Sequence, residues 1–270
     1  MKRRLIFLNF LFFSTIRLYC FSLFAEYEID PAKEIKLEQN GTATIIYYDG
    51  EKHISNFEYE QKGKLTFLNF PNNDIIYNED KITQVLLLVG KQIEKDYKRN
   101  FAIGFSDKNK KFIRDLPRSM EGYCYYKDCT SYLTEGDKKY TIDNLSEIRI
   151  DSPWVEGVSG NGEGEGFTIE GNRTYLLIVN GFISVKKPYL YEMNSRVKTL
   201  KVTGSKSGKT KKLEVIDTPN PQTVDISFLD KEDDTIVRIE SVYPGEKYQD
   251  TCLSLCKLHD KEVIPYLGED

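Results

Sequence analysis

Short segments rich in β-branched and aromatic residues recur along this chain, and this pattern constrains the fold more than any other feature of the sequence. Examples are TATIIYY, YLLIVNGF, RVKTLKVTG and TIVRIESVY, which Gly, Pro, Asn or Asp residues separate from their neighbours. Such side chains pack well on a pleated sheet, and the separating residues favour turns. Without long amphipathic helices, the pattern predicts an all-β fold of the sandwich or jelly-roll type rather than a parallel α/β sheet.

Three places carry further local information. Asp49-Gly50 separates two strand-like segments and supplies the positive φ angles of a tight hairpin turn. The segment 80–100 is compatible with either a helix or strands, because its polar second half has no clear period. The basic run 205–214, SKSGKTKKLE, is interpreted as a solvated hairpin tip rather than a binding site.

The first 25 residues differ from the rest of the chain. Three basic residues at positions 2–4 precede the apolar run 5–16, and a second apolar patch leads to the small residue Ala25. This layout is typical of a cleaved secretory signal. We therefore expect an exported protein, periplasmic, extracellular or on the surface of a bacterial cell, with no transmembrane span after cleavage. Arg17 disfavours an uncut anchor, and lipid attachment at Cys20 is the alternative.

Signal removal changes the charge of the chain. It takes four of the 38 basic residues and no acidic one, which leaves 34 basic against 42 acidic residues, or −8. Nucleic-acid binders and proteins that dock on anionic lipids carry basic surfaces instead. We therefore expect no nucleic-acid partner. With 40% hydrophobic and 13% aromatic residues, the chain can bury a substantial core.

Four cysteines follow the predicted signal. Cys124 and Cys129 are separated by a potential turn, and they are the disulfide candidate. If Cys252 and Cys256 lie on one strand, their Cα atoms are about 13 Å apart, beyond the roughly 7 Å limit for a bridge. These two are expected to share a face of the strand without bridging each other. The C-x-x-C pairs that are usual in zinc sites are missing.

The sequence offers no catalytic motif. The chain has two histidines, His53 on an expected strand and His259 in an expected tail, and neither adjoins a nucleophile motif such as G-x-S-x-G. Carboxylate pairs are too abundant in this chain to indicate a glycosidase. We expect a non-catalytic protein, and the alternative is an activity in the N-terminal half.

A shift in composition near Thr130 predicts the domain organisation. Residues 26–129 are expected to form a smaller β-rich domain of unknown function, and residues 130–258 a β-sandwich complete in itself. The polar tail 259–270 is expected to fray.

Five segments in register carry a family resemblance: SPWVEGVSGNGEGEG (152–166), NGF (180–182), NSRVKTLKV (194–202), DTPNPQTVDI (217–226) and VYPGEKYQDTCLS (242–254). In these segments the chain resembles the NADase-type glycan-binding domain, a bacterial branch of the discoidin-like, galactose-binding-like jelly rolls. The resemblance covers about residues 130–258. It implies an eight-stranded antiparallel sandwich whose loops gather at one end, where related modules hold sugars. The positions that match the motif are Trp154, Glu156, Gly157, Gly160, Gly162, Gly164, Asn194, Arg196, Asp217, Gln222, Pro244, Tyr248 and Asp250.

The resemblance also implies candidate ligand contacts at the loop end. They are Trp154, Glu156, Asn161, Glu163, Asn194, Arg196, Tyr243, Tyr248 and Asp250. Sugar recognition needs an aromatic face and fixed polar groups. Tyr189 and Tyr191 are alternative aromatic platforms to Trp154, and Arg196 could pair with Asp250.

The glycine-rich loop 157–166 also has a purely structural interpretation. Its glycines would let the chain cross the end of the sandwich, while Trp154 fills the core and Glu156 accepts hydrogen bonds from loop N–H groups. A phosphate-binding role is disfavoured, because a strand-like segment rather than a helix follows Gly166 and the loop is acidic.

No cofactor is expected. Many discoidin-like domains carry Asp-Gly-Asp before the tryptophan and a glutamate in the last strand, both near a structural calcium. Here these places hold Glu147–Arg149 and Leu255, which weighs against calcium. The sequence thus predicts an exported carbohydrate-binding protein, with a glycan or glycoconjugate as its partner. The alternative is an envelope assembly protein that binds another protein through the same sandwich.

Overall fold

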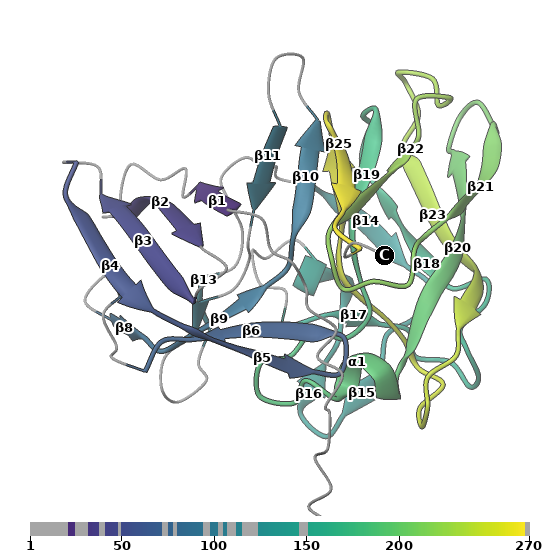
Figure 1. Ribbon diagram of the computed structural model, residues 1–270. Helices are drawn as coiled ribbons and strands as arrows, with labels where there is room; N and C mark the ends of the chain where they lie inside the picture. Colours follow the sequence, from purple (N-terminus) through teal and green to yellow (C-terminus); the bar gives the residue numbers. More distant parts are fainter. Residues whose placement is uncertain are drawn as a thin grey trace, which may run out of the picture.

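The computed structural model describes residues 21–24, 32–37, 41–47, 50–71, 75–77, 80–93, 98–101, 105–106, 112–114, 124–145 and 151–267 (Figure 1). These residues form two larger N-terminal sheets, one large C-terminal sheet and two small hairpins. The one α-helix among them is α1 (Leu190–Met193). The all-β fold predicted from the strand pattern is confirmed.

The first N-terminal sheet has seven strands in the order β25-β10-β11-β1-β2-β3-β4. They are β1 (Phe21–Phe24), β2 (Ala32–Leu37), β3 (Thr42–Tyr47), β4 (Lys52–Asn56), β10 (Gly90–Ile93), β11 (Lys98–Phe101) and β25 (Glu262–Pro265). β3 and β4 pair antiparallel on either side of Asp49-Gly50, as the hairpin prediction requires. β1 pairs with both β2 and β11, so cleavage after Ala25 would remove one strand from this sheet.

The second N-terminal sheet has five strands in the order β13-β12-β9-β6-β5. They are β5 (Glu58–Lys62), β6 (Leu65–Asn69), β9 (Gln84–Leu87), β12 (Phe105–Ser106) and β13 (Phe112–Arg114). A small hairpin joins β7 (Ile75–Tyr77) to β8 (Asp80–Ile82). The described residues of the segment 80–100 therefore form strands (β8 to β11), which resolves the helix-or-strand alternative in favour of strands.

The C-terminal sheet is a sandwich whose two layers are joined at one edge. One layer has the order β14-β18-β23-β20 with β21 beside β20, and the other has the order β24-β19-β22 with β17 beside β24. Its strands are β14 (Tyr126–Cys129), β17 (Trp154–Val155), β18 (Gly166–Ile169), β19 (Tyr175–Asn180), β20 (Ser195–Gly204), β21 (Thr210–Glu214), β22 (Gln222–Asp225), β23 (Thr235–Tyr243) and β24 (Thr251–His259). β20 pairs with β23 over most of its length, but with β24 only at Ser195 and Arg196, where the layers join.

The core of the sandwich lies between its two layers. Buried side chains of β18, β20 and β23 pack with those of β19, β22 and β24, and Trp154 and Leu145 belong to the same cluster. The basic run 205–214 forms the exposed turn and second strand of the β20–β21 hairpin, which agrees with its interpretation as a solvated tip.

A second apolar cluster joins the sandwich to the N-terminal part. Leu177, Val179 and Leu255 on the outer face of β19 and β24 pack with Phe67 of β6 and Leu86 of β9. Both faces of β19 and β24 are therefore buried, and this explains the nearly continuous apolar sequence YLLIVN of β19.

The expectation that residues 259–270 fray is wrong for the described part of this tail. Glu262–Pro265 form β25, which pairs antiparallel with β10 and lies beside it in Figure 1. Val263 is buried in the second apolar cluster, and its N–H donates a hydrogen bond to the Thr223 hydroxyl at 2.8 Å. His259 is the last residue of β24 rather than part of a tail. On the N-terminal side, β14 precedes Thr130 and pairs with β18 of the sandwich.

The four described cysteines are free thiols, so the predicted Cys124–Cys129 disulfide is not formed. β14 is extended at roughly 3.3 Å per residue, which carries Cys129 away from Cys124 beyond the reach of a disulfide. The Sγ of Cys124 instead accepts a hydrogen bond from the N–H of Leu258 at 3.3 Å.

Cys252 and Cys256 are unbridged, as predicted, but they do not share a face. The register of β19 and β24 shifts between Leu253 and Leu255, which leaves Ser254 as a β-bulge. The bulge reverses the alternation, so Cys256 faces the sandwich core while Cys252 packs in a separate cluster with Tyr140.

No helix in the described part of the chain is long and apolar enough to cross a membrane. Residues 1–20 and Ala25 of the expected signal, and the positions Glu147–Arg149 that bear on calcium, lie outside the described residues.

Candidate functional site

The glycine-rich loop has the structural role that the sequence left as an alternative. Trp154 is fully buried, its Nε1–H donates to the Ser131 carbonyl at 3.1 Å, and its ring meets Phe167 edge-on at 5.2 Å. The face of this ring is not available to a sugar. Gly160, Gly162 and Gly164 all have positive φ angles, as a loop that crosses the end of the sandwich requires.

Glu156 holds the same loop in place. It is fully buried, and its two carboxylate oxygens accept hydrogen bonds from the N–H groups of Val158 at 2.8 Å and Thr251 at 3.1 Å. Burial raises the pKa of Glu156, although these two N–H groups oppose the shift. A Cβ atom at Gly162 would lie 2.3 Å from the Glu156 Cγ, so the glycine is needed for this close approach.

Arg196 also bonds within the fold rather than facing a ligand. Its Nε and Nη2 donate to the two carboxylate oxygens of Asp217 at 2.7 and 3.2 Å, and Nη1 donates to the carbonyl of Asn194 at 2.9 Å. The expected pairing of Arg196 with Asp250 is therefore wrong. Burial would raise the pKa of Asp217, but hydrogen bonds from Arg196 and Lys64 outweigh it and hold this pKa below the ordinary value.

Three further predicted residues lie outside any described pocket. The Asn161 carbonyl accepts a hydrogen bond from the Thr251 hydroxyl at 2.7 Å, and the Tyr243 hydroxyl donates to the Val215 carbonyl at 3.1 Å. Glu163 is exposed on the glycine-rich loop.

The structure brings the remaining three predicted residues, Asn194, Tyr248 and Asp250, into one pocket of about 210 Å³. We call it the tyrosine pocket. It lies where the hairpin of β15 (Thr134–Glu135) and β16 (Lys138–Lys139), helix α1 and the loop between β23 and β24 meet, and Figure 1 shows α1, β15 and β16 gathered at this end. The other lining residues are Leu133, Glu135, Tyr140, Val155, Phe182, Lys187, Tyr189 and Leu190.

Two tyrosines at this pocket are exposed. Tyr189 is 52% exposed and Tyr248 is 38% exposed, so both can offer ring surface to a ligand. The floor is apolar, because Val155 and Phe182 belong to a small buried cluster. The sequence named Tyr189 only as an alternative platform, whereas Tyr191, another such alternative, is fully buried.

The polar groups of the pocket include the carboxylates of Glu135 and Asp250, the Tyr140 hydroxyl, the Asn194 amide and the Lys187 ammonium group. Tyr140 donates its hydroxyl to Glu135 Oε2 at 3.0 Å, and burial, followed by this bond, raises the pKa of Tyr140 to about 12. Burial, followed by the charge of Glu135, raises the pKa of Asp250. Sequence reasoning missed Glu135, Tyr140 and Lys187, because they lie in short connecting segments without a recognisable motif.

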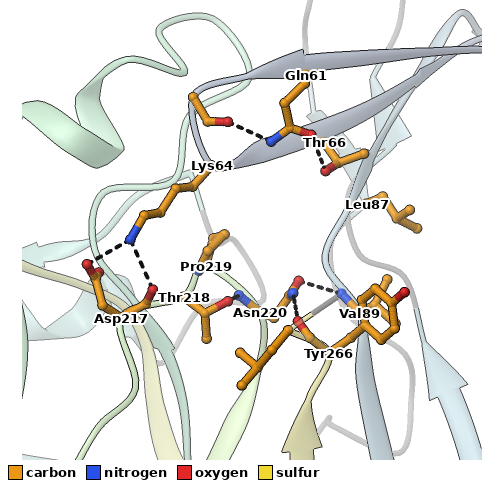
Figure 2. Close-up of a pocket in the computed structure, with 12 residues that line it drawn as sticks. Gln61, Lys64, Thr66, Leu87, Val89, Asp217, Thr218, Pro219, Asn220 and Tyr266 are labelled. Carbon is orange, nitrogen blue, oxygen red and sulfur yellow. Dashed lines mark hydrogen bonds and ion pairs between the residues drawn. The ribbon is translucent and has the colours of Figure 1, made fainter. Parts of the chain in front are cut away.

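A larger hollow of about 380 Å³ separates the N-terminal hairpin β5–β6 from the loop 217–220 (Figure 2). Its polar side chains bond to one another across the gap: Lys64 Nζ pairs with Asp217 Oδ2 at 2.8 Å. Asn220 accepts a hydrogen bond from the N–H of Val89 at 2.7 Å and donates to the carbonyl of Tyr266 at 2.5 Å. The hollow therefore resembles a seam between the two parts of the chain more than a ligand site.

Of the positions that bear on the calcium site of related domains, Leu255 is the one that lies among the described residues. Leu255, which stands where such domains carry a glutamate, is buried in the second apolar cluster and offers no oxygen ligand. Among the described residues, no group of three or more His, Cys, Asp or Glu side chains is placed to hold a metal ion.

The described C-terminal residues form a two-layer sandwich with a pocket at one loop end, an architecture consistent with the discoidin-like domains. Comparison with family models gives the family within this class. The model of the NAD glycohydrolase translocation F5/8 type C domain matches residues 121–259, just over half of the chain, and the chain belongs to this family. This confirms the resemblance found in the sequence. Searches of curated proteins and of solved structures found no match.

Proposed function

We propose that this protein is an exported, non-catalytic binding protein whose C-terminal sandwich takes a carbohydrate in the tyrosine pocket. Family membership supports a binding or translocation-related role for the sandwich. Carbohydrate as the ligand is our inference from the chemistry of the pocket.

One observation carries this proposal: exposed aromatic rings and carboxylates line the same small pocket. Tyr189 and Tyr248 offer faces for the C–H groups of a sugar ring, and Glu135 and Asp250 offer acceptors for its hydroxyls. At about 210 Å³ the pocket is smaller than the roughly 300–1,000 Å³ of sites for drug-sized ligands. It suits one sugar residue of a longer chain.

Export is supported by the basic and apolar residues of the first 25 positions. The description of the matched family, which names translocation, points the same way. A non-catalytic role is supported by the two histidines, because His53 on β4 and His259 at the end of β24 do not line the tyrosine pocket.

The test is a glycan-array screen of the full chain, repeated with calcium and with a chelator. We expect saturable binding to a defined sugar class that is unchanged by the chelator. Tyr248→Ala should weaken this binding roughly fivefold to tenfold, which corresponds to the loss of one aromatic contact. Tyr125→Ala is the matched control, because Tyr125 is 70% exposed but does not line the pocket.

If the folded chain binds no glycan on the array, the proposal is contradicted. That result would favour the alternative, in which the same sandwich binds another protein of the cell envelope. That alternative predicts a co-purifying protein partner whose binding does not respond to sugars.

A further inference from the structure

A second hollow of about 380 Å³ adjoins the tyrosine pocket. We call it the lysine pocket, because Lys138, Lys186 and Lys187 line it together with Ser152 and Ser184. The two hollows share Tyr140, Phe182, Lys187 and Leu190, so they lie side by side along a common wall.

The wall is built around Tyr140. The Lys138 ammonium lies over the Tyr140 ring, 4.5 Å from its centroid, on the lysine-pocket side. The hydroxyl of the same ring donates to Glu135, which lines the tyrosine pocket. One buried ring thus positions a cation for one hollow and a carboxylate for the other.

The charges of the two hollows differ in sign. The lysine pocket has three lysines and one carboxylate, that of Asp151, whereas the tyrosine pocket has Glu135 and Asp250 against Lys187. Lys138, Lys186 and Lys187 are exposed, and none of them forms an ion pair with another residue in the described part of the chain. Lys127, Lys209 and Lys212 of the sandwich each pair with a carboxylate. Lys201 and Lys206 likewise form no ion pair within the described part of the chain, but they line neither hollow.

Each hollow suits a different part of one ligand. Carboxylates accept hydrogen bonds from the hydroxyls of a neutral sugar, whereas ammonium groups bind carboxylate or sulfate through charge-assisted hydrogen bonds. The whole chain is acidic, with a formal net charge of −4, so it repels anions at long range. The lysine pocket therefore favours an anionic group, because its three lysines form no ion pairs and lie beside a sugar-sized pocket.

We propose that the ligand is an acidic glycan, with a neutral sugar residue in the tyrosine pocket and a carboxylate or sulfate group of the same chain in the lysine pocket. This rests on the proposed carbohydrate-binding function and narrows its ligand class.

The test measures the affinity of the full chain for three probes at low and at physiological salt. The probes are an oligogalacturonate, its carboxyl-reduced neutral counterpart, and the same neutral oligosaccharide bearing sulfate groups. We expect at least one of the two acidic probes to bind about tenfold more tightly than the neutral one at low salt, with a smaller preference at physiological salt. The two acidic arms distinguish carboxylate from sulfate.

The double variant Lys138→Gln/Lys186→Gln separates the two pockets. In this variant the ratio of the affinities for the acidic and neutral probes should fall to about one, while the affinity for the neutral probe is unchanged. The matched control is Lys201→Gln/Lys206→Gln, which removes the same charge from exposed positions that line neither pocket. The control should retain the preference.

The outcomes distinguish the two proposals. Equal binding of acidic and neutral probes would overturn the acidic-glycan inference and leave carbohydrate binding in place. Equal loss of preference in both double variants would also overturn it, because the effect would then come from net charge alone. Failure of all three probes to bind, together with silence of the glycan array, would overturn the proposed function itself.

Discussion

At the scale of single residues, the glycine-rich loop shows that a motif can reflect packing rather than ligand binding. Trp154 and Glu156 match the family motif, yet both are buried and bonded within the fold. The sequence predicted both interpretations, because a tryptophan followed by glycines suits a core plug as well as a binding platform. Only the position of the Trp154 ring against Phe167 decides between them.

The close contact of Gly162 with Glu156 gives a first prediction. Gly162→Ala should destabilise the fold by about 3–4 kcal/mol, because it combines a strained positive φ with displacement of the buried carboxylate. Gly160→Ala should cost only about 1–2 kcal/mol, since its φ is also positive but nothing lies within 4 Å of the added Cβ. Urea unfolding measures both, and equal losses would refute the role of the Glu156 contact.

His259 gives a second prediction, on the dependence of stability on pH. Burial lowers the pKa of His259 from 6.5 to about 4. The charge of Asp260 opposes this shift, whereas the charges of Lys257 and Lys261 add to it. Between these two pH values the unfolded chain therefore binds a proton that the folded chain does not. The contribution of His259 to the free energy of unfolding should fall as the pH drops from 6.5 to about 4, and then level off.

The measurement for His259 is the difference between wild type and His259→Leu in urea unfolding from pH 4 to pH 7. As the pH is lowered from 7 to 4, the free energy of unfolding of wild type should fall relative to that of the variant. Glu156 and Asp250, whose pKa values are raised, act in the opposite direction in both proteins and cancel in the difference. A difference that is constant with pH would contradict the prediction.

At the scale of strands, turn residues and alternation suffice to predict hairpins such as β20–β21, but not the edge strand β14, whose segment is expected from the sequence to turn between Cys124 and Cys129. β20 and its partner β21 follow directly from RVKTLKVTG and the solvated turn after it. The face to which each side chain of β24 points does not follow from the sequence, because the bulge at Ser254 depends on hydrogen bonds to Gly181 and Ile183, which are distant in sequence. The pairing of the polar segment 262–265 depends on β10 in the same way.

β25 gives a third prediction. Val263 is 2% exposed and packs in the second apolar cluster, whereas its neighbour Ile264 is 46% exposed. Val263→Ala should lower the free energy of unfolding by about 2 kcal/mol, from two buried methyl groups and the cavity that they leave. Ile264→Ala removes a larger group but should cost about 0.5 kcal/mol or less. If the tail frays, neither substitution should lower the free energy of unfolding. That result would contradict the pairing of β25 with β10.

At the scale of the whole molecule, the two parts of the chain meet through an apolar cluster and a polar seam. Asp217 is the centre of the seam, because it pairs with Lys64 of the N-terminal hairpin (Figure 2). It also pairs with Arg196 of the sandwich. The Arg196 side chain is 9% exposed and that of Lys64 is 41% exposed. The two ion pairs should therefore differ in energy.

The seam gives a fourth prediction. Asp217→Asn should destabilise the protein by about 2–3 kcal/mol, because it leaves the buried Arg196 charge uncompensated. Lys64→Met should cost about 1 kcal/mol or less, because its ion pair is exposed to solvent. Thermal and urea unfolding of both variants provide the comparison. Equal effects would mean that the Arg196 pair contributes no more than the exposed pair.

The sequence predicts the architecture of this protein better than its site. The family motif identifies the sandwich, because its spacing follows the strands and turns of the fold. The tyrosine pocket draws Glu135 and Tyr140 from a small hairpin and Tyr189 from the approach to α1, and these segments come together only in the folded chain. Of the nine predicted contacts, Asn194, Tyr248 and Asp250 line the pocket, and all three flank secondary-structure elements rather than lie within the glycine-rich loop.

The pairing of β10 with β25 also bears on the order in which the chain is completed during synthesis or passage through a membrane pore. Gly90 pairs with Pro265, so β10 acquires its partner β25 only after the intervening residues, which include the described sandwich, have emerged. Contacts between such distant residues slow folding, and an unpaired strand edge can associate with other chains in the meantime. A chain that emerges amino end first therefore exposes this edge of β10 until β25 has emerged, and we expect a chaperone to bind there in the meantime.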